Sequence, residues 1–267
     1  MDPERLRIIA GKEKFNLAMI EKDYMLTKVL YMIRDIKGMY FKGGTAINKI
    51  LLEHARLSED LDFSLAISTK QAEKKIIEQL SDPLITNITK GKEVDGFTRI
   101  IVRYRLIGPE GEIFLDLNSR AKLLKEPKER IISHFYAQEF PFFSIKTLAE
   151  EELIAEKVAA TIGRNKPRDY YDVYNLIKAG KKISLSLVKK KCEGSGKEYD
   201  VLKMFNNAQK LKNRWDADMN ALIREKVSFE EVMKFLAKSF KLKEEKEKRK
   251  ERKMRKIQRG KLPLSCA

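Results

Sequence analysis

Two aspartates separated by one residue are the part of this sequence best suited to chemistry. Asp60 and Asp62 lie in SEDLDFSLAI, where polar and apolar residues alternate as in a strand, so both carboxylates should point to one face. Two carboxylates on one face repel each other unless a cation lies between them. Oxygen ligands with no His or Cys nearby favour Mg²⁺ or Mn²⁺. The pair therefore predicts a divalent-metal site.

A glycine pair precedes these aspartates. Gly43 and Gly44 lie between MYFK, a predicted short strand, and TAINKILLEHA, a helical pattern. Such a turn frees backbone N–H groups, and the positive end of the helix dipole attracts anions. We expect the glycines to hold the phosphate oxygens of a nucleotide and Thr45 to offer its hydroxyl. The spacing differs from GxxxxGK[ST], which excludes a Walker phosphate loop.

A third carboxylate, Asp116, lies in the apolar run IFLDLN, which predicts another strand. If that strand neighbours the strand of Asp60 and Asp62, the three acids converge. Two metal ions about 3.5–4 Å apart could then serve the in-line attack of a hydroxyl on an α-phosphate. In that arrangement Asp116 would bind the second ion or accept the proton of the attacking hydroxyl.

The elements that position these residues change in character along the chain. Before residue 146, helices are predicted over about 14–36 and 70–80 and at TAINKILLEHA, and strands at MYFK, LDFSLAI, TRIIVRYRLI, EIFLDLNSR, 131–136 and 142–145. The turn at 108–111 predicts that TRIIVRYRLI and EIFLDLNSR form an antiparallel hairpin. After Thr147 only helical patterns remain. We therefore expect a mixed lobe over 1–145, a helical lobe over 146–240 and a tail over 241–267.

Composition limits the class of protein. With 267 residues, 43% of them hydrophobic, the chain can bury a core. No apolar run approaches the roughly 18 residues that a membrane-spanning helix needs. Two distant cysteines and two separate histidines exclude a disulfide framework and argue against a zinc site. The N-terminus lacks the apolar segment of a signal peptide, so we expect a cytoplasmic protein with no membrane partner.

The chain is strongly basic, and the charge is uneven. Of a net charge of +17, residues 241–261 carry +8, from twelve basic and four acidic side chains. An excess of this size predicts a polyanionic partner, most simply nucleic acid. For the tail itself two interpretations stay open: contact with a phosphate backbone, or a solvated charged segment.

The order of these features resembles a known family. GGTAINK, then ARLSEDLDFSL, then a later strand aspartate, is similar to the nucleotidyltransferase superfamily with the DNA polymerase beta palm fold, and especially to its AbiEii/AbiGii toxin branch. EELIAEKVAATIGRNKPRDYYDVYNL matches the same branch, which carries a lysine on one helix and Arg-Asp-x-x-Asp at the start of the next. The resemblance implies an α+β fold, in which a palm-like mixed sheet lobe precedes an all-helical lobe.

The resemblance also implies roles for individual residues. The implied catalytic residues are Asp60, Asp62, Asp116, Lys157 and Asp169, of which the first three would bind metal. The implied nucleotide-binding residues are Gly43, Gly44, Thr45, Lys157 and Arg168. Arg56, Ser58 and Asp172 also match the family motifs, without a defined role.

The function implied by the resemblance is the metal-dependent transfer of a nucleoside monophosphate from an NTP to an acceptor hydroxyl, with release of pyrophosphate. The charge favours RNA as acceptor, and relatives that modify tRNA make tRNA the first choice. The protein would then be the toxin of a toxin–antitoxin or abortive-infection pair, with an antitoxin as partner. Two alternatives stay open: transfer to a small molecule or a protein hydroxyl, and a non-catalytic basic protein that binds nucleic acid through a degenerate transferase fold.

Overall fold

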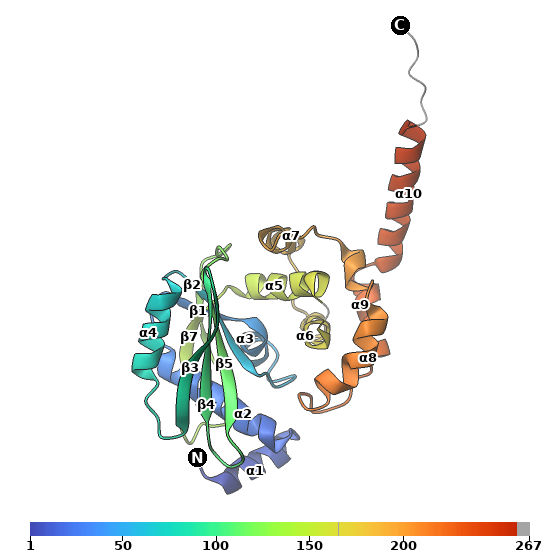
Figure 1. The fold of residues 1–267 in the computed structure, drawn as a ribbon. Coiled ribbons are helices and arrows are strands. Elements are labelled where there is room, and N and C mark those ends of the chain that lie inside the picture. The colour runs from blue at the N-terminus through green and yellow to red at the C-terminus, as the bar shows by residue number, and fades with distance from the viewer. Residues whose placement is uncertain (165, 261–267) are drawn as a thin grey trace.

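In a computed structural model that describes residues 1–164 and 166–260, seven strands form one mixed sheet with helices on both sides (Figure 1). The strand order is β3-β4-β5-β2-β1-β7-β6. The strands are β1 (Met39–Lys42), β2 (Asp60–Leu65), β3 (Ile85–Val94), β4 (Phe97–Tyr104), β5 (Gly111–Asn118), β6 (Lys128–Ile131) and β7 (Ser144–Thr147). Together with the helices they make the α+β class that the sequence predicts.

The pairing of the central strands brings the acidic residues together. β2 runs parallel to β5, and this register sets Asp62 opposite Asp116. On its other side β2 pairs antiparallel with β1, which sets Lys42 opposite Asp62. β4 pairs antiparallel with β5, with Arg99 opposite Asp116. Because side chains alternate along a strand, Asp60 lies on the same face as Asp62, while Leu61 between them is buried on the other face.

Helices cover the two faces of the sheet unequally. The helices that precede or interrupt the sheet in sequence are α1 (Pro3–Glu13), α2 (Leu17–Ile33), α3 (Gly43–Ile50) and α4 (Thr69–Gln79). Those that follow it are α5 (Glu150–Gly163), α6 (Pro167–Lys178), α7 (Leu185–Gly194), the 3-10 turn η1 (Val201–Met204), α8 (Ala208–Met219), α9 (Phe229–Ser239) and α10 (Leu242–Gly260). Figure 1 shows α4 on one side of the sheet and α3, α5 and α6 on the other.

Apolar side chains gather in two clusters. The larger cluster lies between the sheet and its helices and includes Leu26, Phe41 and Leu115. The smaller cluster lies within the helices after β7 and includes Tyr170 and Trp215. Each part of the molecule therefore has a core of its own, and the face that carries the acidic residues lies toward the contact between the two parts.

The basic tail is helical where it is described. α10 leaves the body at α9 and extends away from it (Figure 1). Within its first half, Arg249 forms an ion pair with Asp200 at 3.1 Å. Residues 261–267 of the predicted tail lie outside the described residues. No helix among the residues that the structure describes is both long and apolar enough to cross a membrane.

Some elements differ from the sequence prediction. The helix predicted over 14–36 is α2, which is shorter at both ends and begins only where the Asn16 side chain caps it. α1, which ends at Lys14 in a left-handed conformation, was not predicted. The strand predicted at 131–136 overlaps β6 only at Ile131, where β6 ends, and the strand predicted at 142–145 is β7, which begins two residues later than predicted. After Ile131 the chain is irregular, and its apolar residues enter the core, where Tyr136 donates to Asp23 at 3.0 Å. β3 was not predicted, since its sequence ITNITKGKEV lacks regular alternation.

Candidate active site

Three carboxylates lie on neighbouring positions of β2 and β5. Burial raises the pKa of Asp62 to about 6; Lys42 opposes this rise, whereas Asp116 and Asp60 add to it. Burial likewise raises the pKa of Asp60, and the charge of Arg168 opposes it. These carboxylates are therefore close enough to disfavour one another's ionisation, as the sequence predicts for Asp60 and Asp62. We call Asp60, Asp62 and Asp116 the acid cluster.

Asp116 differs from the other two acids because its carboxylate is paired with the guanidinium of an arginine. The Arg99 guanidinium donates to both of its carboxylate oxygens, from Nε at 2.7 Å and from Nη2 at 2.7 Å. The same guanidinium lies over the ring of Phe114, 4.7 Å from its centroid. Arg99 is absent from the residues singled out in the sequence. Its place in the site follows from the β4–β5 register.

The residues present fit a divalent cation at Asp60 and Asp62. The donors are carboxylate oxygens, and their mutual repulsion is the kind that a bound cation relieves. Within the described part of the chain, no three Asp, Glu, His or Cys side chains form a ready-made metal site. Asp116 as a third metal ligand therefore stays a prediction.

The glycine turn packs directly against the acid cluster. Gly43 has a φ of +79°, and a Cβ placed there would lie 2.0 Å from Oδ2 of Asp62. At Gly44 a Cβ would lie 2.7 Å from a guanidinium nitrogen of Arg56. Neither position accommodates a side chain. α3 begins at Gly43, next to Asp62, and its first N–H groups have no side-chain cap from Lys42.

Thr45 braces two elements. Its hydroxyl donates to the backbone carbonyl of Asp60, and its side chain is buried. This bond ties α3 to the start of β2 and so helps to fix the acid cluster. To act as a phosphate ligand, as the sequence predicts, the hydroxyl would have to leave that carbonyl.

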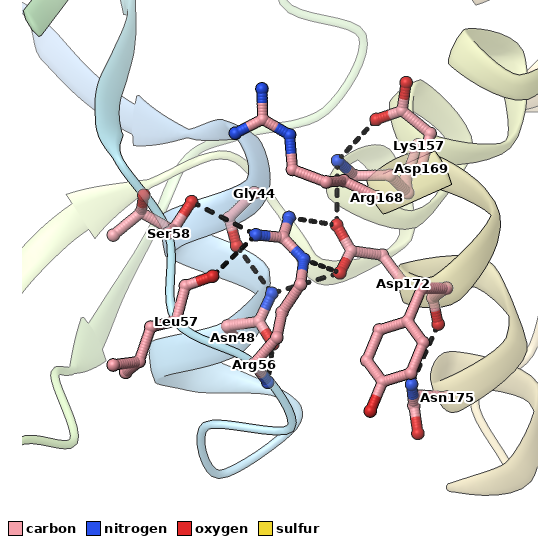
Figure 2. Close-up of polar contacts among 12 residues, drawn as sticks. Gly44, Asn48, Arg56, Leu57, Ser58, Lys157, Arg168, Asp169, Asp172 and Asn175 are labelled. Carbon is pink, nitrogen blue, oxygen red and sulfur yellow. Dashed lines mark hydrogen bonds and ion pairs between the residues drawn. The ribbon is translucent and has the colours of Figure 1, made fainter. Parts of the chain in front are cut away.

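A buried network of ion pairs, which we call the charged seam, joins the segment before β2 to α5 and α6 (Figure 2). It consists of Arg56, Lys157, Asp169 and Asp172, each with a side chain no more than 6% exposed. Arg56 donates to both oxygens of Asp172 at 2.7 Å each. Lys157 contacts Asp169 and Asp172 at 3.0 Å each. Every charge in the seam therefore has an oppositely charged partner.

Two further side chains extend the seam. The amide of Asn48 donates to Asp172 at 3.2 Å and to the carbonyl of Gly44 at 3.0 Å, which joins the seam to the glycine turn (Figure 2). Arg164 donates to Asp169 at 2.7 Å. Neither Asn48 nor Arg164 is among the residues predicted from the sequence.

The two predicted nucleotide-binding cations differ in availability. Burial disfavours the charged form of Lys157, but Asp169 and Asp172 outweigh it and raise the pKa of the ammonium. Lys157 thus remains charged, with both carboxylates as its contacts. Arg168 lies nearer the surface, forms an ion pair with Glu59, and has a side chain 24% exposed. Arg168 is therefore the more accessible cation beside Asp60.

A comparison with protein families shows the family to which this chain belongs. The family described as "Nucleotidyl transferase AbiEii toxin, Type IV TA system" matches residues 31–245, from the end of α2 through the start of α10. The chain belongs to this family. It is accordingly a nucleotidyltransferase toxin of a type IV toxin–antitoxin system, and membership implies a cognate antitoxin. The resemblance seen in the motifs is confirmed.

Solved structures share the fold of this AbiEii family member. MenT4, a nucleotidyltransferase toxin from Mycobacterium tuberculosis H37Rv, is 19% identical, with 89% of each chain covered and a TM-score of 0.63. JHP933 from Helicobacter pylori is 18% identical, with 91% of this chain and 99% of that chain covered and a TM-score of 0.58. At this identity the likeness shows the fold alone. Among curated proteins no significant sequence match was found.

Proposed function

We propose that this AbiEii family member transfers a nucleoside monophosphate from an NTP to a hydroxyl of RNA, with tRNA as the first candidate, and releases pyrophosphate. The observation that carries the proposal is the β2–β5 register, which sets Asp62 opposite Asp116 beside the start of α3. A net charge of +17 supports a polyanionic acceptor. We place the reaction in the cytoplasm, where NTPs and tRNA are both abundant.

Each part of the site has a task in this reaction. Asp60 and Asp62 would hold Mg²⁺ or Mn²⁺, which when bound offsets phosphate charge and polarises the α-phosphate. The N–H groups at the start of α3 and the guanidinium of Arg168 bind phosphate oxygens. The charged seam holds α5 and α6 against α3, so that Arg168 stays beside Asp60.

The chemical step is a displacement at phosphorus. The oxygen of the acceptor hydroxyl bonds to the α-phosphorus, and the bond from that phosphorus to the bridging oxygen of pyrophosphate breaks. The hydroxyl proton passes to a carboxylate of the acid cluster. The protein mainly supplies position and charge, which fits a site made of carboxylates, arginines and helix N–H groups.

The experiment that tests the proposal incubates the protein with each of the four α-labelled NTPs, Mg²⁺ and total RNA. We expect label from one or more NTPs in the tRNA band, and none with EDTA. Asp218→Asn is the matched control for acid-cluster variants, because it also removes one carboxylate but lies on the surface of α8. Label in a protein band or a small molecule would replace RNA as acceptor, and no label at all would support the non-catalytic alternative.

A further inference from the structure

The ion pair between Arg99 and Asp116 has a bearing on the number of metal ions that the site accepts. Arg99 comes from β4 and Asp116 from β5, at directly opposite positions of an antiparallel pair. Both oxygens of the carboxylate accept a hydrogen bond from the guanidinium, at 2.7 Å each. A paired fork of this kind is the strongest arrangement between arginine and a carboxylate. The guanidinium also stacks over the ring of Phe114, with its central carbon 4.7 Å from the ring centroid.

A second pair on the same two strands shows that an arginine directly opposite a carboxylate does not always form a close ion pair. Arg103 and Glu112 also lie directly opposite each other on β4 and β5. Their closest contact is 3.9 Å, and both side chains are more than a third exposed. The Asp116 side chain is only 16% exposed. The same cross-strand arrangement thus gives a loose pair at Arg103 and a close, partly desolvated one beside the acid cluster.

The positive charge of Arg99 extends to the whole acid cluster. It pairs with Asp116, and Asp116 lies directly opposite Asp62 on the neighbouring strand β2. The cluster carries three carboxylates, so one divalent cation together with Arg99 balances their charge before any nucleotide arrives. A second divalent cation would compete with the guanidinium for the oxygens of Asp116, each of which already accepts a hydrogen bond from it, and would meet its charge at close range.

We propose that Arg99 takes the place of a second metal ion. The nucleotide-free site then binds one divalent cation, at Asp60 and Asp62. Asp116 binds no metal and stays paired with Arg99. The proposal rests on the metal-dependent transfer proposed above. Arg99 is in this view a positioning residue that fixes Asp116 and the charge of the cluster. The chemistry of Asp116 is then set by a residue from the neighbouring strand, 17 positions earlier in the sequence.

Counting bound Mn²⁺ tests this without any measurement of activity. Titration of the nucleotide-free protein, followed by the electron paramagnetic resonance signal of free Mn²⁺, is expected to give one ion per chain. Arg99→Gln frees both oxygens of Asp116 and removes a positive charge, so we expect two ions per chain. The double variant R99Q/D116N removes the arginine and the carboxylate together, and should bind one ion with an affinity within about threefold of the unaltered protein.

Arg103→Gln is the matched control, because it removes the same charge from the same strand, and it should bind one ion with unchanged affinity. Circular dichroism checks that each variant is folded. Two ions in the unaltered protein, or a double variant that loses its ion, would overturn the proposal and leave metal-dependent transfer intact. No bound ion in the unaltered protein or in R99Q would overturn both.

Discussion

At the scale of single residues, the site depends on two carboxylates that are held close together. Asp60 and Asp62 share one face of β2, and burial raises the pKa of both. We expect Asp60→Asn to reduce nucleotide transfer at least about 1,000-fold, because the variant keeps the shape of the side chain and removes one of two charged metal ligands. The measurement is transfer of α-label to RNA at saturating Mg²⁺. Transfer within tenfold of the unaltered protein, by a folded variant, would contradict the mechanism.

Asp62 gives a second prediction at this scale, for stability without metal. Its pKa rises from an ordinary value of 3.8 to about 6 on folding, so the folded chain binds this proton more tightly than the unfolded chain. The free energy of unfolding should therefore fall as pH rises from about 4 to 6 and then level off. Asp62→Asn lacks this dependence, and above pH 6 it should be more stable than the unaltered protein by about 1–2 kcal/mol. Urea unfolding in EDTA at pH 5 and pH 7.5 measures the difference. A variant that is no more stable at pH 7.5 would contradict it.

Sequence reasoning reaches those residues whose spacing is itself informative. Asp60 and Asp62 are two apart, and Gly43 and Gly44 are adjacent, so local pattern is enough to notice them. Arg99, Asn48 and Arg164 are different. Each matters through a partner far along the chain or on another element. For the two arginines residue type alone gives no signal, because Lys and Arg total 56 in this chain. The roles of the predicted catalytic and nucleotide-binding residues remain predictions for mutagenesis.

At the scale of elements, the strands of the β4–β5 hairpin can be predicted from the sequence, but the register between them cannot. The sequence predicts two antiparallel strands with a turn at 108–111, and β4 and β5 confirm the strands. Pairing ends at Tyr104 opposite Gly111, so the connection covers residues 105–110. A turn centred on 108–111 would place a residue other than Arg99 opposite Asp116. The strand order and the parallel β2–β5 pairing are likewise set by packing between distant segments.

The charged seam gives a prediction at the scale of elements. Asp172→Asn removes the charge that both Arg56 and Lys157 contact, and leaves those cations buried with fewer acceptors. We expect the free energy of unfolding to fall by about 3–5 kcal/mol. The matched control is Asp218→Asn, since it breaks the surface pair with Arg214 and should cost about 0.5 kcal/mol or less. Urea unfolding of both variants at one pH compares them, and equal losses would show that the seam contributes no more than a surface pair.

At the scale of the whole molecule, charge is divided between a folded body and an arm. Residues 241–261 carry +8 of the net +17, and their described part, α10, extends away from the other helices. The body still carries +9, around a site made of acids. The lobe boundary predicted after residue 145 stays a proposal: there are two apolar clusters, but the larger one also takes in Leu153 of α5 and Leu176 of α6.

Deletion of residues 241–267 tests the arm. If α10 contacts the phosphate backbone, the truncated protein should bind RNA at least about tenfold more weakly at low salt, and its affinity should depend less steeply on salt concentration. Fluorescence anisotropy with labelled tRNA from 50 to 300 mM salt measures both quantities. Unchanged affinity and an unchanged salt slope would show that the arm is only solvated charge. NTP binding serves as the control, since α10 contacts α9 and η1 and lies away from β2 and β5, the strands of the acid cluster (Figure 1).

The charged seam also sets how the contact between the two parts of the molecule responds to temperature. Apolar cores gain little further strength on warming, whereas the cost of removing water from ions falls as temperature rises. The seam is made of ions that contact one another away from water. The hold of α5 and α6 on α3 is therefore expected to weaken less on heating than the packing inside either core. The geometry around the acid cluster is then expected to persist on heating until the two apolar cores unfold.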